Sequence, residues 1–149
     1  AFCRTHFKQK GKELDRDVVE NLYERFDGVT YYLQRIMNEL YTRTPVGSVC
    51  RTEDIDSAVQ FIVDVSSPIY EDLLYQLPEK QSQILIAIGK EGKAKNLTSG
   101  KFCKKYGLAS PNSVKSALPA LVDKGLLVKD KDTYQIYDMF FSLWLNQRI

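Results

Sequence analysis

The sequence lacks the features that define several classes of protein. Its 149 residues contain no run of about 18 uncharged apolar residues, so we expect no transmembrane helix and no membrane partner. The first ten residues, AFCRTHFKQK, also lack the apolar stretch of a secretory signal. Hydrophobic residues make up 44% and charged residues 27% of the chain, which suits a folded domain and excludes a disordered one.

Cysteine and histidine are scarce. The three cysteines, Cys3, Cys50 and Cys103, form no CxxC pair, and His6 is the only histidine. Such a set is typical of reduced thiols in a cytoplasmic protein, and it lacks the ligand spacing of a zinc site. We therefore predict a cytoplasmic location and no metal site.

The residue patterns that support catalysis are also missing. The carboxylates of Asp15 and Asp17 are two positions apart, a spacing that puts them on different faces of a helix. The single histidine is far from Cys103 in the sequence, so a cysteine–histidine pair has no support. We predict no catalytic residue and no enzyme activity for this chain alone.

The net charge of +2 is the sum of two halves with opposite charge. Residues 1–76 contain 9 Lys/Arg and 13 Asp/Glu, a net of −4, whereas residues 77–149 contain 12 and 6, a net of +6. Pro78 suits the first turn of a new helix. We therefore predict a domain boundary here, and the basic second half favours an anionic partner.

Short helices are predicted throughout the first half, and no strand pattern is convincing before residue 77. Each helix is indicated by apolar side chains at helical spacing, with capping residues or Pro/Gly breaks at the ends. The predicted helices run from Asp15 to about Arg25, from about Thr30 to Thr42, from Thr52 to an interruption at Ser66-Ser67-Pro68, and near residues 69–75.

The second half has a different order of elements: three helices, a hairpin and a final helix. The first helix covers 79–89, the second is short, capped by Thr98 or Ser99, and runs through Lys105, and the third is capped by Ser110 and ends at Gly125. Strands near 126–128 and 134–137 form the hairpin, and an amphipathic helix over 139–145 follows. Three helices followed by a hairpin is the order of a winged helix-turn-helix. The predicted fold class is therefore mainly α, with a helical bundle followed by a winged helix that carries a small β-hairpin wing.

Several phrases of the sequence resemble a known family. LPEKQSQILIAIGKEG, LTSGKFCKKYGLASPNSVKSALPALVDKGLL and YQIYDMFFSLWL resemble the C-terminal winged helix of bacterial and archaeal P-loop ATPases of the AAA+/STAND type. DGVTYYLQRIMNELY resembles the helical lid that follows the nucleotide-binding core in those proteins. The resemblance implies an AAA+ lid-like subdomain over residues 1–76 and a winged-helix domain over residues 77–149.

The chain lacks the nucleotide-binding motifs of this family. It has no Gly-x-x-x-x-Gly-Lys-Ser/Thr motif, and the stretch Gly89-Lys90-Glu91-Gly92-Lys93 lacks the spacing that cradles phosphate. No hydrophobic run ends in a pair of acids that would hold Mg²⁺. We therefore expect this chain to be the C-terminal part of a larger ATPase, with ATP and Mg²⁺ bound only by an upstream core.

The lid resemblance also implies a position for contact with nucleotide. Tyr31 falls where an arginine of many AAA+ lids reaches the γ-phosphate, and Arg35 follows one turn later as a candidate substitute. The alternative interpretation of Arg35 is a solvated side chain on a helix face. Both interpretations stay open at this point.

DNA is the partner that the winged-helix order favours, because the third helix of this fold enters the major groove and the wing approaches the backbone. The candidate contacts are Lys101, Lys104, Lys105, Asn112, Ser113, Lys115, Ser116, Lys129 and Lys131. This helix face has no arginine for reading guanine, and Pro119 lies in mid-helix. We expect weak binding of low specificity, although the lysines could equally form an ordinary solvated face.

The alternative function is a protein-interaction or regulatory module. The aromatic side chains near the C-terminus could pack on the ATPase core or on another copy in a homo-oligomer, although rings at this spacing more often close the winged-helix core. These side chains are Tyr137, Phe140, Phe141 and Trp144.

Overall fold

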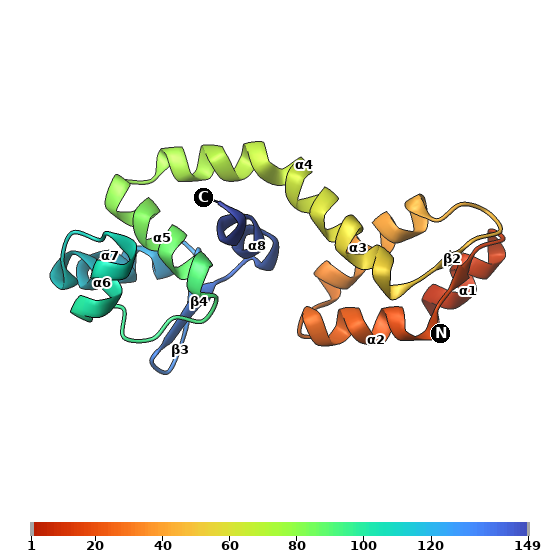
Figure 1. The fold of residues 1–149 in the computed structure, drawn as a ribbon, viewed down its shortest axis with the longest axis horizontal. Helices are drawn as coiled ribbons and strands as arrows, with labels where there is room; N and C mark the ends of the chain where they lie inside the picture. Colours follow the sequence, from red (N-terminus) through yellow and green to blue (C-terminus); the bar gives the residue numbers. More distant parts are fainter. Residues whose placement is uncertain (1, 149) are drawn as a thin grey trace. The chain divides into compact units, whose positions relative to one another are not determined.

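The fold of the chain comes from a computed structural model that describes residues 2–148 (Figure 1). It is mainly helical, as predicted, with two small two-stranded sheets. The residues form two compact units, of which the first ends at Asp64 and the second begins at Val65. Among the described helices, none combines the length and apolar character that crossing a bilayer requires.

The first unit is built from short helices around a core of aliphatic and aromatic side chains. Its elements are α1 (Phe2–Gln9), β1 (Glu13–Leu14), α2 (Arg16–Arg25), α3 (Thr30–Arg43), β2 (Val49–Cys50), the 3₁₀ turn η1 (Thr52–Asp54) and the start of α4 (Ile55–Gln76). The helices predicted near 15–25 and 30–42 are confirmed. Val18, Leu22 and Ile36 are completely buried and anchor α2 and α3 in the core.

The two strands of this unit correct our expectation of no strand before residue 77. β1 and β2 pair in parallel, with Glu13 opposite Val49 and Leu14 opposite Cys50. The Glu13 N–H donates to the Ser48 carbonyl at 3.0 Å. Two residues are too few for an alternating pattern to appear in the sequence, so this pairing depends on tertiary packing.

Helix α4 corrects the predicted interruption at Ser66-Ser67-Pro68, because it is continuous from Ile55 to Gln76 with Pro68 inside. Proline removes one backbone donor from the helix. Contacts with α8 (Met139–Gln147) stabilise the helix on both sides of Pro68. The Trp144 Nε1–H donates to Ser67 Oγ at 2.9 Å, and the Tyr70 and Phe141 ring centroids are 4.9 Å apart. Packing of this kind overrides a local breaking signal.

The start of α4 also differs from the prediction. Thr52 is the first residue of η1 rather than the cap of a long helix. The Arg51 N–H donates to Asp54 Oδ2 at 2.8 Å, so the Asp54 carboxylate satisfies a backbone donor at the start of η1. The acidic residues remain at the positive end of the helical segment, where they are favourable.

The second unit contains every element that the sequence predicts there. They are α5 (Glu79–Glu91), α6 (Gly100–Tyr106), α7 (Pro111–Asp123), β3 (Leu127–Asp130), β4 (Thr133–Ile136) and α8. β3 and β4 pair antiparallel as the wing, with Leu127 opposite Ile136 and Asp130 opposite Thr133. This is the order of a winged helix-turn-helix.

The aromatic residues near the C-terminus belong mostly to the core of this unit. Phe140, Phe141 and Trp144 are 3%, 2% and 7% exposed, so they close the core rather than form a contact surface. Tyr137, by contrast, is 66% exposed. Close packing of α5 on α8 is possible because Gly89 has no side chain: a Cβ there would lie 2.5 Å from Leu145 Cβ.

Residues 65–76 of α4 lie in the second unit and contribute to its packing. Beyond Ser67 and Tyr70, Arg148 of the C-terminal segment pairs with Glu71 at 2.6 Å. The domain boundary near residue 77 stays a prediction.

Candidate nucleic-acid interface

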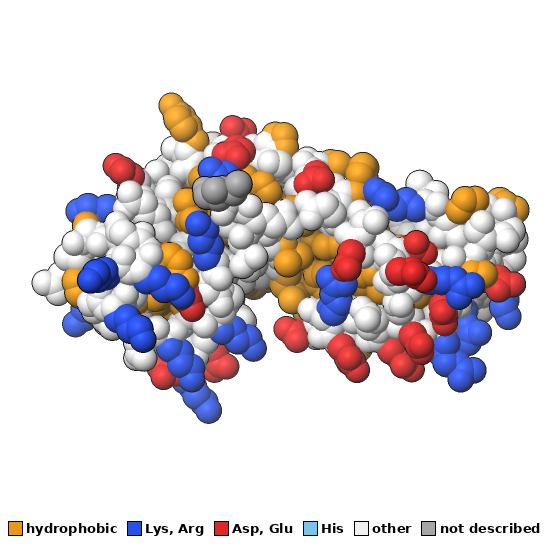
Figure 2. Space-filling model, viewed as in Figure 1, with side chains coloured by type: hydrophobic (Ala, Val, Ile, Leu, Met, Phe, Trp, Pro, Cys, Tyr) orange, Lys and Arg blue, Asp and Glu red, His pale blue; other side chains and the backbone are white. Residues whose placement is uncertain are grey.

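Helix α6 presents two predicted lysines to solvent. The Ser99 side chain caps the helix by accepting from the Phe102 N–H at 3.1 Å. Phe102 and Cys103 face the core and are buried, which leaves Lys101 and Lys104 exposed and one turn apart. Figure 2 shows Lys and Arg side chains spread over this part of the second unit.

Helix α7 follows after a sharp turn. Gly107 has φ +65°, which favours glycine, and Ser110 Oγ caps α7 by accepting from the Ser113 N–H at 3.1 Å. The face of α7 that packs on the core holds Val114, Ala117, Leu118 and Leu121. Asn112 and Lys115 therefore lie on the exposed face.

The two candidate serines of α7 are less available for contact with DNA than Asn112 and Lys115. Ser113 is half-buried, and its carbonyl accepts a hydrogen bond from Ser116 Oγ at 3.0 Å. The Ser116 side chain is exposed, but this bond uses its one hydroxyl proton. Asn112 is therefore the candidate side chain of α7 best suited to bidentate contact with a base edge.

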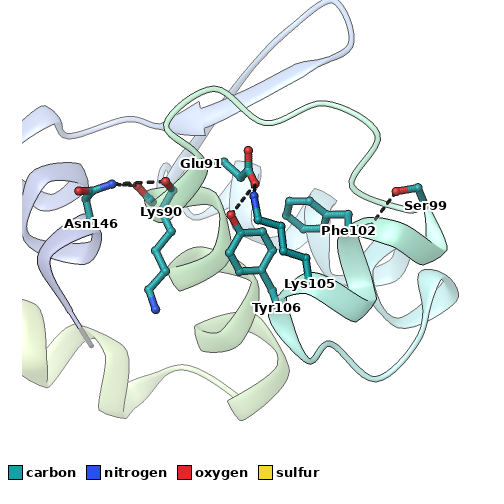
Figure 3. Close-up of polar contacts among 8 residues, drawn as sticks. Lys90, Glu91, Ser99, Phe102, Lys105, Tyr106 and Asn146 are labelled. Atoms are coloured by element: carbon teal, nitrogen blue, oxygen red, sulfur yellow. Dashed lines mark hydrogen bonds and ion pairs between the residues drawn. The ribbon is translucent and has the colours of Figure 1, made fainter.

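Lys105 lies in a polar cluster with Glu91 at the end of α5 (Figure 3). Its Nζ donates to Glu91 Oε1 at 2.6 Å, and the Tyr106 hydroxyl donates to the same oxygen. The hydrogen bonds that Glu91 accepts from Lys105 and Tyr106 lower the pKa of its carboxyl, and the bond that Lys105 donates to Glu91 raises the pKa of Lys105. Both groups therefore stay ionised at neutral pH, and their opposite charges offset one another. This ion pair was not predicted from the sequence.

The wing carries balanced charge. Lys129 and Lys131 are exposed as predicted, but Asp130 and Asp132 alternate with them and are exposed too. Lys129 Nζ lies 5.6 Å from the centroid of the Tyr134 ring. The tip of the wing therefore adds little net positive charge to the surface.

Two lysines that sequence reasoning missed lie beside the wing. The Ala94 N–H donates to the Tyr134 carbonyl at 2.8 Å, and the Tyr134 N–H returns the bond at 2.9 Å, so the segment after α5 runs along β4. This pairing places exposed Lys93 and Lys95 next to the sheet. The sequence shows the charge of these lysines but not their position, because the bridge between Ala94 and Tyr134 forms only when the wing folds.

The two nucleotide candidates lie on α3 in the first unit. Tyr31 is 61% exposed and its ring contacts Tyr32 edge to face at a centroid distance of 5.3 Å. Arg35 is exposed one turn later. Within residues 2–148, no cluster of three or more His, Cys, Asp or Glu side chains is arranged to hold a metal ion.

Comparison with known proteins identifies the second unit. A family model described as "Probable winged helix domain" matches residues 68–147, more than half of the chain, from the second part of α4 to the end of α8. No curated protein and no solved structure matches the chain. With the three helices, the paired wing and this match, the chain belongs to the winged helix domain family.

Proposed function

We propose that the winged helix of this chain binds duplex DNA with low sequence specificity. The observation that carries the proposal is a group of exposed lysines on α6, α7 and the segment beside the wing. They are Lys93, Lys95, Lys101, Lys104 and Lys115. Of the lysines in this part of the described chain, Lys105 alone forms a salt bridge within the protein, so the others are available for phosphate oxygens.

Phosphate contacts supply most of the affinity in this proposal. Asn112 is the principal side chain for reading a base, and the exposed face of α7 contains no arginine, the residue most used to read guanine. Contacts to phosphate position a protein on DNA but carry no sequence information. Binding is therefore expected to depend strongly on salt and weakly on sequence.

A labelled short duplex, titrated with the full chain by fluorescence anisotropy at about 50 and about 200 mM salt, tests this function. The variant Lys101→Glu/Lys104→Glu/Lys115→Glu should lose most of the binding and most of its salt dependence. The matched control is Arg4→Glu/Lys8→Glu/Lys10→Glu, which makes the same charge change at exposed positions of the first unit. Equal losses in both variants, or no salt-dependent binding by the wild type, would overturn the proposal.

We also propose that the chain is the C-terminal part of a cytoplasmic P-loop ATPase, with ATP and Mg²⁺ held by an upstream core that is also its partner. The support is the resemblance of the lid and winged-helix phrases. Tyr31 and Arg35, both exposed, are the residues that would approach nucleotide from this chain. The sequence that precedes this chain provides the test: a phosphate-binding loop there supports the proposal, and its absence contradicts it.

A further inference from the structure

The part of α4 in the second unit has two different faces. Its inner face packs within the winged-helix unit through Ser67 and Tyr70, as described above. Its outer face carries exposed apolar side chains at spacings of three to six residues: Val65 is 54%, Ile69 68% and Tyr75 91% exposed, and Pro68 is exposed between them. Val65 shares one side of the helix with Pro68 and Ile69, which follow it by three and four residues. Figure 2 shows hydrophobic side chains, with acidic ones among them, along the upper edge of the molecule, where Figure 1 labels α4.

This pattern is unusual for a helix at the surface of a folded unit. Single exposed apolar residues are ordinary, but a helix that already buries one stripe normally presents polar residues on the other. Several exposed apolar side chains gathered on one helix face are typical of a surface that binds another protein.

The charges on this segment indicate what kind of partner fits. Residues 65–76 contain Glu71 and Asp72 and no Lys, Arg or His. Glu71 is paired with Arg148, whereas Asp72 is exposed on the apolar stripe, with no ion pair to any described residue. Because Arg148 offsets the charge of Glu71, Asp72 is the uncompensated charge of this face. Two copies of the face would bring their Asp72 carboxylates together, and Asp72 would repel the phosphates of DNA.

We propose that the outer face of residues 65–76 is a docking surface for an amphipathic helix of a partner protein, one that carries Lys or Arg beside its aliphatic side chains. The aliphatic side chains pack on Val65, Pro68 and Ile69, and a basic side chain pairs with Asp72. This is recognition of one apolar helix stripe by another, with charge selecting the partner. The surface is separate from the proposed DNA contacts on α6 and α7, so either proposal can fail alone.

A labelled peptide of about 15 residues, made only of Leu and Lys in an amphipathic helical pattern, serves as the probe in an anisotropy titration of the full chain. Val65→Gln/Ile69→Gln should weaken binding about ten-fold or more, a loss of about 1.4 kcal/mol. Asp72→Lys should weaken it several-fold. Matched controls are Val46→Gln, at a 75% exposed valine of the first unit, and Glu20→Lys, at an exposed site on α2; both should bind as the wild type does.

Three outcomes would overturn the proposal. The first is equal peptide binding by all variants. The second is equal binding of a Leu/Glu peptide of the same pattern, which would remove the requirement for a basic partner. The third is a wild-type dimer in sedimentation that Val65→Gln/Ile69→Gln makes monomeric, since a second copy would then occupy the face. Unchanged Trp144 fluorescence and an unchanged circular-dichroism spectrum establish that the variants are folded.

Discussion

Gly89→Ala tests the packing of α5 on α8, because two effects of opposite sign compete there. Alanine is a better helix former than glycine by about 1 kcal/mol. The added Cβ, however, would lie 2.5 Å from Leu145 Cβ and 3.0 Å from its Cδ1. Leu145 is completely buried, and its Cβ is fixed to the backbone, so α5 and α8 would have to separate.

The steric effect is expected to dominate. Overpacking of a core costs about 1–3 kcal/mol, and the separation would also stretch the hydrogen bonds from Asn146 Nδ2 to the Gly89 and Lys90 carbonyls, which are already 3.5 and 3.3 Å long. We predict that Gly89→Ala lowers the free energy of unfolding by about 1–2 kcal/mol.

Urea unfolding followed by tryptophan fluorescence measures this change. Trp144 is the only tryptophan and precedes Leu145 in α8, so its emission reports on the affected contact. Gly100→Ala is the matched control, since its Cβ would meet nothing within 4 Å at the start of α6. A Gly89→Ala variant that is as stable as the wild type would refute the packing argument.

Three further changes have defined outcomes. Glu91→Gln should free Lys105, tighten DNA binding and steepen the salt dependence by about one phosphate contact, measured by anisotropy; weaker binding would contradict this. Because the pKa of Glu91 is lowered in the fold, its contribution to stability is present above its ordinary pKa of 4.5 and is lost as pH falls through the lowered value, so urea unfolding of wild type and Glu91→Gln should converge at acid pH. Ser67→Ala removes the acceptor of the Trp144 indole and should cost about 1 kcal/mol in urea unfolding, with unchanged stability as the opposing result. Ser110→Ala removes the cap of α7 and should cost about 1 kcal/mol, whereas Ser116→Ala should cost much less.

The elements of the second unit were predictable because local chemistry defines their ends. Ser99 and Ser110 each accept a hydrogen bond from a backbone N–H three residues on, a property of one short segment. Gly107 and Gly125 take positive φ values of 65° and 74° after their helices. Such signals are legible in the sequence because they do not depend on distant residues.

Features that depend on distant contacts were not predictable. Pro68 appears in the sequence as a break, but packing of Ser67 on Trp144, far along the chain, keeps α4 continuous. The candidate interface shows the same limit. Exposed Lys101 and Lys115 follow from helix periodicity, whereas the position of Lys95 depends on the bridge between Ala94 and Tyr134.

The central claim is that DNA contacts the lysine-bearing face of the winged helix, and backbone amide chemical shifts of the full chain test it most directly. On adding a short duplex at low salt, we expect shifts in residues 93–96, in α6 and in the first turns of α7, and we expect higher salt to reverse them. The amides of α1, α2 and α3 should stay in place. Shifts centred on those three helices, or none at any salt concentration, would contradict the account.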